Sequence, residues 1–114
     1  MTSNKLYVVL VTTSTPKQAE EIAEHLVRQQ LAACVNIIGP IRSVYVWEGN
    51  LQKEEEYLLF IKAAAQNFAD LESAVREKHS YAVPEVIALE VVEGSQPYLE
   101  WVLSATPMRR VPEK

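Results

Sequence analysis

The sequence predicts an α+β domain with the element order β-α-β-β-α-β and a short C-terminal helix, the split βαβ arrangement of ferredoxin-like folds. Two stretches of the chain each combine a run of β-branched and other apolar residues with a segment of helical periodicity. Between them lies a long strand–turn–strand segment around Gly49-Asn50. A hairpin between two such units places both helices on one face of a four-stranded sheet.

The length and composition of the 114-residue chain indicate one globular domain. This domain is assigned to residues 1–105, with an irregular tail at 106–114. A hydrophobic content of 48% and a charged content of 23% are ordinary for such a domain. The net charge of −4 argues against a nucleic-acid partner, because non-specific nucleic-acid binders present a basic face. The single cysteine and the lack of an apolar run long enough to cross a membrane predict a cytoplasmic protein without a membrane partner.

The first predicted strand, Lys5–Thr13, is a continuous apolar run, which is typical of a strand in the middle of a sheet. A helix follows, with Thr15 as N-cap, Pro16 at the first helical position and Gln18 where a capping box has Glu or Gln. This helix should end near Gln29-Gln30. Its apolar stripe consists of Ala19, Ile22, Ala23, Leu26 and Val27.

The central hairpin has arms at Ala33–Trp47 and Glu56–Ala64. Its first arm could reach ~50 Å if straight, whereas a chain of this size forms a globule roughly 35 Å across. The hairpin should therefore project beyond its own domain. A bulge, a bend or an unpaired edge position is expected at Gly39-Pro40, because proline cannot donate to a strand ladder. The exposed apolar residues of the hairpin need a cover, and a second copy of the chain is the simplest one.

Two registers of this hairpin are compatible with the sequence. A two-residue turn at Gly49-Asn50 would place Trp47 opposite Gln52. A three-residue loop, Glu48–Asn50, would place Trp47 opposite Leu51. It would also place the oppositely charged Arg42 and Glu56 across from each other. The second register is preferred, because an apolar pair and an opposite-charge pair each contribute ~0.2–1 kcal/mol.

The second half of the chain completes the predicted order. It predicts a helix at Asn67–His79 with Asn67 as N-cap, a loop at Ser80–Glu85, a strand at Val86–Val92 and a last helix from Ser95 to about Ala105. The first two helices cover one face of the sheet, whereas the strands are apolar on both sides. The opposite face would be bare in a monomer, which favours oligomerisation independently of the length of the hairpin.

Few residues are candidates for catalysis or ligand binding, and each of them also has an ordinary structural interpretation. Cys34, among apolar neighbours, is interpreted as a small buried residue rather than a ligand or nucleophile. His79 either satisfies the last carbonyl groups of its helix or binds a ligand. Lys62, within an apolar strand, must extend to solvent or meet a carboxylate. The run Glu54-Glu55-Glu56 is interpreted as a solvated start of a strand.

Motifs of the common enzyme and metal sites do not occur in the sequence. There is no glycine-rich phosphate loop, no nucleophile elbow, no catalytic carboxylate pair and no zinc-ligand spacing. Only 3 glycines occur in the whole chain, which leaves little room for a glycine-rich loop. Neither an enzyme nor a required cofactor is therefore expected.

Motifs that match a known family occur at Leu31–Ile37, Ser43–Gly49, Ile61-Lys62, His79–Tyr81 and Val83–Leu89, and further along at Gly94 and Tyr98–Trp101. In these segments the chain resembles the CutA family, the divalent-cation-tolerance proteins, over about Leu6 to Leu103. The resemblance implies a PII-like homotrimer of ferredoxin-like subunits, with intersubunit sheets formed by the hairpins and ligand clefts between subunits. It also implies a link to copper tolerance, with copper or another divalent cation as a candidate ligand.

The resemblance implies a set of cleft residues in which His79 is also the candidate metal ligand. This set consists of Trp47, Lys62, His79, Tyr81 and Glu85. Where some members have a cysteine at the end of the first strand and adjacent histidines at the end of the second helix, this chain has Val11 and Lys78-His79. Only His79 of that copper set remains. Further departures from the residues common in the family are Ala63, Ser80 and Ala82.

Three functions are compatible with these features. The first is a non-enzymatic homotrimer that binds a metal or small ligand between its subunits and takes part in metal-ion tolerance. The alternatives are a PII-like regulatory trimer that acts on an unidentified partner protein, and a structural trimer that anchors another protein. Lys62 facing Glu85 across a polar cleft would favour ligand binding, whereas a cleft filled with apolar side chains would favour anchoring.

Overall fold

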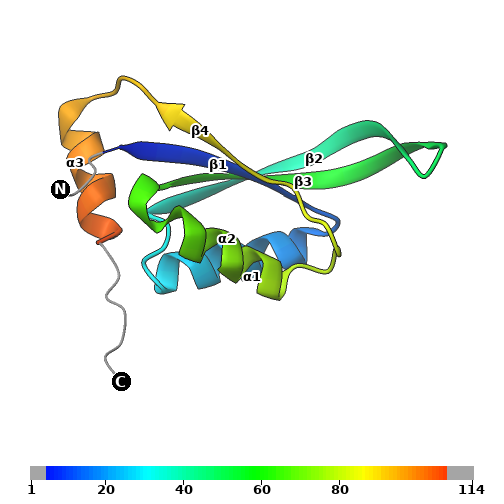
Figure 1. Ribbon diagram of the computed structural model, residues 1–114, viewed down its shortest axis with the longest axis horizontal. Helices are drawn as coiled ribbons and strands as arrows, with labels where there is room; N and C mark the ends of the chain where they lie inside the picture. The colour runs from blue at the N-terminus through cyan, green and yellow to red at the C-terminus, as the bar shows by residue number, and fades with distance from the viewer. Residues whose placement is uncertain (1–4, 108–114) are drawn as a thin grey trace.

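The computed structural model describes residues 5–107. Its elements are β1 (Leu6–Thr13), α1 (Pro16–Arg28), β2 (Cys34–Trp47), β3 (Asn50–Ala64), α2 (Phe68–Lys78), β4 (Val86–Val91) and α3 (Gln96–Ala105), with a 3-10 turn at Ala65–Asn67 (Figure 1). The predicted α+β class and the predicted order of elements are confirmed. Residues 108–114 of the predicted tail lie outside the described residues.

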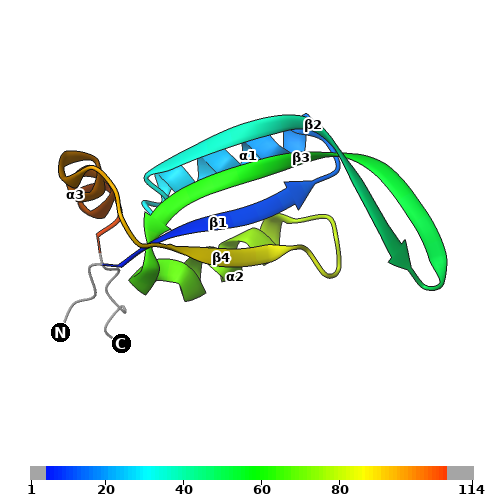
Figure 2. The same cartoon turned by 90° about the horizontal axis from the view of Figure 1, so that it is seen from above.

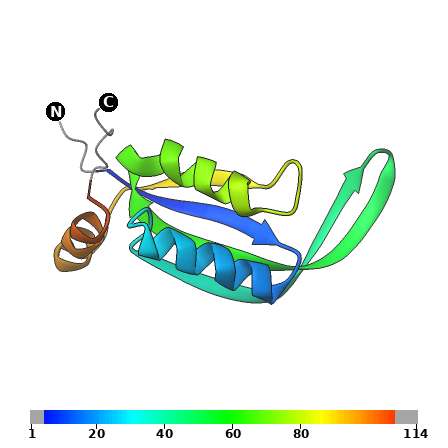
Figure 3. The same ribbon diagram turned by 90° about the horizontal axis from the view of Figure 1, so that it is seen from below.

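β1 lies in the middle of the sheet, as its apolar residues on both faces predict. The strand order is β2-β3-β1-β4, and every neighbouring pair is antiparallel. α1 and α2 lie side by side on one face, whereas α3 lies beyond one end of the sheet (Figures 1 and 3). The core between these helices and the sheet is formed chiefly by Val9, Val11, Ile22, Leu26, Leu59, Ile61, Leu71 and Val75. Val27 of the predicted stripe is not part of it, because its side chain is exposed at the rim of α1.

The helix ends confirm one predicted cap and correct two others. The hydroxyl of Thr15 accepts from the backbone N–H of Gln18 at 3.1 Å, so Thr15 is the N-cap of α1. The side-chain amide of Gln18 is used elsewhere: it donates to the carbonyl of Lys78 at 3.4 Å, at the end of α2. Asn67 makes no side-chain capping bond to α2, because its amide donates to the carbonyl of Thr106 at 3.2 Å. Asn67 therefore fixes the end of α3 to the start of α2.

The hairpin register differs from both predicted alternatives. Trp47 pairs with Asn50, and the turn between them consists of Glu48 and Gly49. Both turn residues have positive φ angles, 51° and 81°, as in a type I′ turn. The prediction was wrong because it ranked registers by side-chain pairs. The right-handed twist of the strands favours a two-residue turn of this type over the small gains from those pairs.

A bulge interrupts the pairing of β2 with β3 where Gly39-Pro40 predicts one. The register shifts between Ile38 and Ile41. The ring of Tyr57 lies close against the backbone here, and a Cβ atom on Gly39 would be 2.5 Å from a ring carbon. Glycine is therefore required at this position by the close approach of an aromatic side chain.

The hairpin projects beyond the body of the molecule, as its length predicts (Figure 2). The longest dimension of the chain is 46 Å, and its radius of gyration is 15.0 Å, above the ~13 Å of a compact chain of about 100 residues. The outer part of the hairpin exposes large side chains, namely Val44, Tyr45, Val46, Trp47 and Leu51. An extended apolar arm of this kind is unusual on a monomer.

Candidate functional site

The face of the sheet opposite α1 and α2 is largely apolar, and we call it the open face. Because strand side chains alternate, the neighbours of core residues point to this face. It is formed by Val8, Leu10, Cys34, Asn36, Ile38, Leu58, Phe60, Lys62, Ile87 and Leu89. Ile38, Ile87 and Leu89 are each about half exposed. The open face thus presents apolar area to solvent in the single chain.

Lys62 lies within this apolar surface. Its strand neighbours are Val8 on β1 and Cys34 on β2. Its ammonium group donates to Oδ1 of Asn36 and lies 5.4 Å from the ring centroid of Phe60. The sequence predicted that Lys62 would reach solvent or a carboxylate; its ammonium group lies at the surface of the single chain, where its partners within residues 5–107 are a neutral amide oxygen and an aromatic face. Cys34, predicted to be buried, is only partly buried.

His79 fixes the loop after α2 to the end of β1. Its Nδ1 accepts from the backbone N–H of Tyr81 at 3.1 Å, so the proton of the neutral ring is on Nε2. Nε2–H donates to the carbonyl of Thr12 at 2.7 Å. The ring is therefore bonded to β1 rather than to the last carbonyls of its own helix. A metal ion needs a free ring nitrogen, and both are in use, so the geometry of His79 does not fit a metal ligand.

Carboxylates gather at the base of the hairpin, and we call Glu54, Glu56 and Glu85 the acidic cluster. Glu56 is buried, and its Oε2 accepts from the hydroxyl of Tyr81 at 2.8 Å. Glu54 accepts from the hydroxyl of Tyr45 at 2.5 Å. The prediction of a solvated acidic run was therefore wrong for Glu56. Strand alternation could not have indicated this burial, because it places Glu56 on the same side as the exposed residues of the open face.

Hydrogen bonds and burial change the proton equilibria around the acidic cluster. The hydrogen bond to Glu54 raises the pKa of Tyr45 to about 12. Burial and the hydrogen bond to Glu56 raise the pKa of Tyr81. Partial burial, followed by the charge of Glu56, raises the pKa of Glu85. Both phenols therefore remain protonated donors at neutral pH, and the base of the hairpin is a region of negative potential.

The five predicted cleft residues do not come together within one chain. His79, Tyr81 and Glu85 lie near the base of the hairpin, on the loop between α2 and β4. Lys62 lies beside the start of β2, whereas Trp47 is the last residue of that strand. A strand of 14 residues separates these two positions by about 43 Å if straight. A single site that contains all five residues would need more than one copy of the chain.

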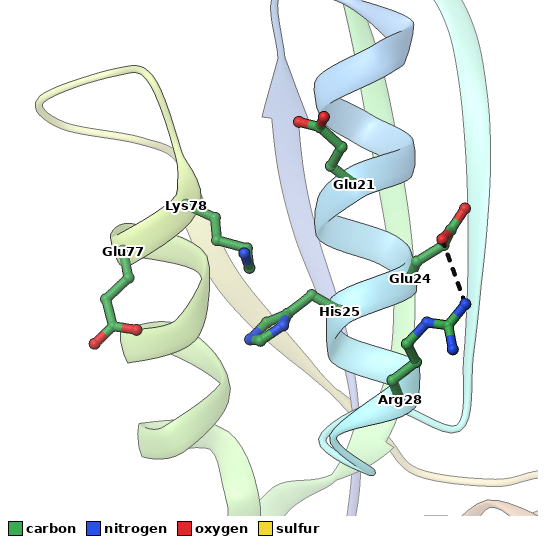
Figure 4. Close-up of a pocket in the computed structure, with 6 residues that line it drawn as sticks. All are labelled: Glu21, Glu24, His25, Arg28, Glu77 and Lys78. Carbon is green, nitrogen blue, oxygen red and sulfur yellow. Dashed lines mark ion pairs between the residues drawn. The ribbon is translucent and has the colours of Figure 1, made fainter.

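Elsewhere on the described chain the candidates are weaker. Within residues 5–107, no three His, Cys, Asp or Glu side chains group closely enough to hold a metal ion. A groove of about 560 Å³ lies between α1 and α2, with His25 and Lys78 pointing into it and Glu77 turned away (Figure 4). The ion pair of Arg28 with Glu24, 3.9 Å long, lies at its rim. No described helix has the length and apolarity needed to span a membrane.

Comparisons with known proteins agree with the geometry. The profile of the family described as "CutA1 divalent ion tolerance protein" matches residues 7–105. The divalent-cation tolerance protein CutA of Thermus thermophilus is 40% identical over 99 residues, which are 87% of this chain and 96% of that protein. Protein CutA of Homo sapiens is 45% identical over 96 residues, which are 84% of this chain and 54% of that protein. The chain thus spans about half the length of the human relative.

Solved structures give the same result. CutA1 from Oryza sativa superposes with a TM-score of 0.90 at 39% identity, covering 94% of this chain and 100% of that chain. The divalent cation tolerance protein from Thermus thermophilus superposes with a TM-score of 0.87 at 39% identity, covering 90% of this chain and 99% of that chain. Since the family profile and these relatives match nearly the whole described fold, the chain belongs to the CutA1 divalent ion tolerance family.

Proposed function

We propose that this chain acts as a homotrimer in divalent-cation tolerance, without enzymatic chemistry, and that it binds a small ligand in clefts between its copies. The observation that carries the proposal is the open face together with the projecting hairpin, two apolar surfaces that one chain leaves exposed. Exposed apolar area of this extent marks an interaction site. The assignment to divalent-cation tolerance rests on relatives such as the CutA protein of Thermus thermophilus, which is described as a divalent-cation tolerance protein.

The ligand site would combine residues that one chain keeps apart. In a trimer, Trp47 and Lys62 of neighbouring copies could meet His79, Tyr81 and Glu85 of another copy at the boundary between chains. A small polar ligand fits this set better than a copper ion held by His79, since both ring nitrogens of His79 are hydrogen-bonded. A divalent cation bound by this protein would use other donors.

The cytoplasm is the location that the single cysteine supports, because free thiols persist in reducing compartments. Relatives differ in this respect. Protein CutA of Arabidopsis thaliana is described as chloroplastic, and the CutA structure from Archaeoglobus fulgidus as that of a periplasmic protein. Fractionation of the source cells, with antibodies against this chain, tests the location directly.

A PII-like regulatory trimer is the second candidate, and one contact favours it. The hydroxyl of Tyr81 bonds the buried Glu56, so the loop between α2 and β4 is tied to β3, the second strand of the hairpin. A ligand that moves this loop would therefore move the base of the hairpin, where a partner protein could sense it. A trimer that only anchors another protein has no such contact in its favour.

The experiment measures mass and ligand binding on the same samples. We expect light scattering at micromolar concentration to give the mass of three chains; a stable monomer would refute the homotrimer. Copper is then titrated calorimetrically into the wild type, His79→Ala and the control His25→Ala. Equal stoichiometric binding in all three would assign a cation to donors other than His79. Loss of binding in His79→Ala alone would refute our interpretation of the ring, and no binding in the wild type would remove copper from the proposal.

A further inference from the structure

The loop between α2 and β4, residues 79–85, depends on side chains for its conformation. Its one backbone-to-backbone hydrogen bond among residues 5–107 joins the N–H of His79 to the carbonyl of Val75, at the end of α2. Residues 80–85 form no such bond within the described chain. Backbone groups outside helices and strands are otherwise satisfied by side chains or water. Side-chain contacts therefore decide where this loop lies, with Tyr81 and Glu85 on it.

Gln18, in the first turn of α1, holds the chain on both sides of His79. Its side-chain nitrogen Nε2 donates to the carbonyl oxygen of Lys78 at 3.4 Å. Its Oε1 accepts from the hydroxyl of Ser80 at 3.1 Å. These contacts join positions 60 and 62 residues apart in the sequence. The half-buried side chain of Gln18 thus links the helix layer to the two residues that flank His79.

Among side chains of this length, only a glutamine can make both contacts at neutral pH. Its amide carries a donor and an acceptor in one plane, whereas a carboxylate only accepts and a thioether accepts weakly. The two bonds fix the backbone at positions 78 and 80, and they therefore limit the directions in which His79 can point. Its ring donates to the carbonyl of Thr12 and accepts from the N–H of Tyr81. Both contacts of the ring need that direction.

We propose that Gln18 is a positioning residue for the loop between α2 and β4. It acts through His79, whose ring joins the loop to β1, and through Tyr81, whose hydroxyl joins the loop to Glu56 at the base of the hairpin. Its effect on ligand binding rests on the proposed function, because Tyr81 and Glu85 belong to the proposed ligand site. Its effect on the loop itself does not.

Amide hydrogen exchange of the full-length chain, followed by NMR, tests this role without any ligand. The reporter is the N–H of Tyr81, which is bonded to Nδ1 of His79, and its exchange rate follows local opening of the loop. Gln18→Met removes both contacts, keeps the backbone bond to Thr15, and should speed this exchange about threefold to tenfold. Ser80→Ala removes one contact and should have a smaller effect. The double variant should exchange no faster than Gln18→Met alone, because Ser80 acts through Gln18.

Gln18→Glu separates the positioning role from the stability of α1. An acidic residue in the first turn favours a helix, and Glu suits the capping box after Thr15. A carboxylate cannot donate to the carbonyl of Lys78, however. We therefore expect the Tyr81 amide to exchange faster in Gln18→Glu, although α1 itself is no less stable. The matched control, Gln96→Met, removes an exposed glutamine contact of 3.1 Å from α3 and should leave this rate within about twofold of the wild type.

The pattern of exchange across the chain decides the outcome. Faster exchange at Tyr81 in both Gln18 variants, with the amide of Val9 in the central strand unchanged, supports the positioning role. Equal acceleration at Val9 would indicate global unfolding and would overturn it. A wild-type rate at Tyr81 in Gln18→Glu, or an equal effect of the control, would also overturn it. A wild type that light scattering shows to be monomeric would refute the homotrimer and leave the positioning role standing.

Discussion

Removal of the Tyr81 hydroxyl tests whether the buried carboxylate at the base of the hairpin depends on its donor. Glu56 is only 6% exposed and accepts this hydroxyl at 2.8 Å. A hydrogen bond to a charged group contributes about 1.5–3 kcal/mol to stability, and a buried carboxylate that loses its donor keeps its desolvation cost. Tyr81 is itself half-buried, so water can replace part of the bond. We therefore expect Tyr81→Phe to lower the free energy of unfolding by about 1–2 kcal/mol.

The assay is urea unfolding followed by far-UV circular dichroism. All proteins are compared at one concentration, because assembly changes the apparent stability. Tyr45→Phe is the matched control: it deletes the same atom from a 2.5 Å bond to the exposed Glu54 and should have little effect. In a Glu56→Met background, which has no carboxyl oxygen to accept the hydroxyl, its loss should cost much less, and this double-mutant cycle measures the coupling between the two residues.

The comparison between the two phenylalanine variants can refute the reasoning. If Tyr81→Phe is no more destabilising than Tyr45→Phe, the hydrogen bond to Glu56 contributes nothing beyond an exposed one. The loop between α2 and β4 would then not be tied energetically to the hairpin. In that case the regulatory candidate loses the contact that favours it.

Further predictions concern the buried ring of His79, the close approach of Tyr57 to Gly39, and the titration of Tyr45 at alkaline pH. His79→Ala should cost about 1–3 kcal/mol in urea unfolding, because two backbone groups lose their partner, whereas the control His25→Ala should cost far less. Gly39→Ala should cost about 1–3 kcal/mol, since its Cβ would lie 2.5 Å from the Tyr57 ring, and less in a Tyr57→Leu background; equal costs would contradict the contact. The hydrogen bond to Glu54 raises the pKa of Tyr45 from 10.0 to about 12, so its phenolate should form only as the pH rises through about 12; Tyr45 is exposed, so little folding stability depends on this step. Ultraviolet titration of the phenolate should show this late step, and it should be missing in Tyr45→Phe.

Most of the fold could be predicted because its determinants are local. The continuous apolar run predicted the central position of β1, and Thr15-Pro16 predicted the start of α1. The register of the hairpin could not be predicted in this way. Side-chain pairs differ by less than ~1 kcal/mol between registers. The turn instead requires a left-handed conformation of Glu48, which few residues other than glycine adopt and which nothing in the local sequence indicates.

Less of the candidate site could be predicted, because its contacts join distant parts of the chain. His79 and its acceptor carbonyl are 67 residues apart, and Tyr81 and Glu56 are 25 residues apart. Hydrophobic periodicity gives no information on such contacts. The partner of Lys62 also depends on the register: Asn36 pairs with Phe60, two residues before the lysine, only once β2 and β3 are aligned.

The open face and the hairpin together restrict the assembly that can cover both. Two copies that join by their open faces would form a closed dimer, because each face is then used by the other. Such a dimer would leave Val44, Val46 and Leu51 of each hairpin exposed, as they are in the single chain. In a ring, each copy can offer its open face to one neighbour and its hairpin to the other, because the two surfaces differ. We therefore expect a closed ring of more than two chains. In this ring, Val44, Val46 and Leu51 should be protected from solvent. The fluorescence of Trp47 should lie at a shorter wavelength than in the dissociated chain.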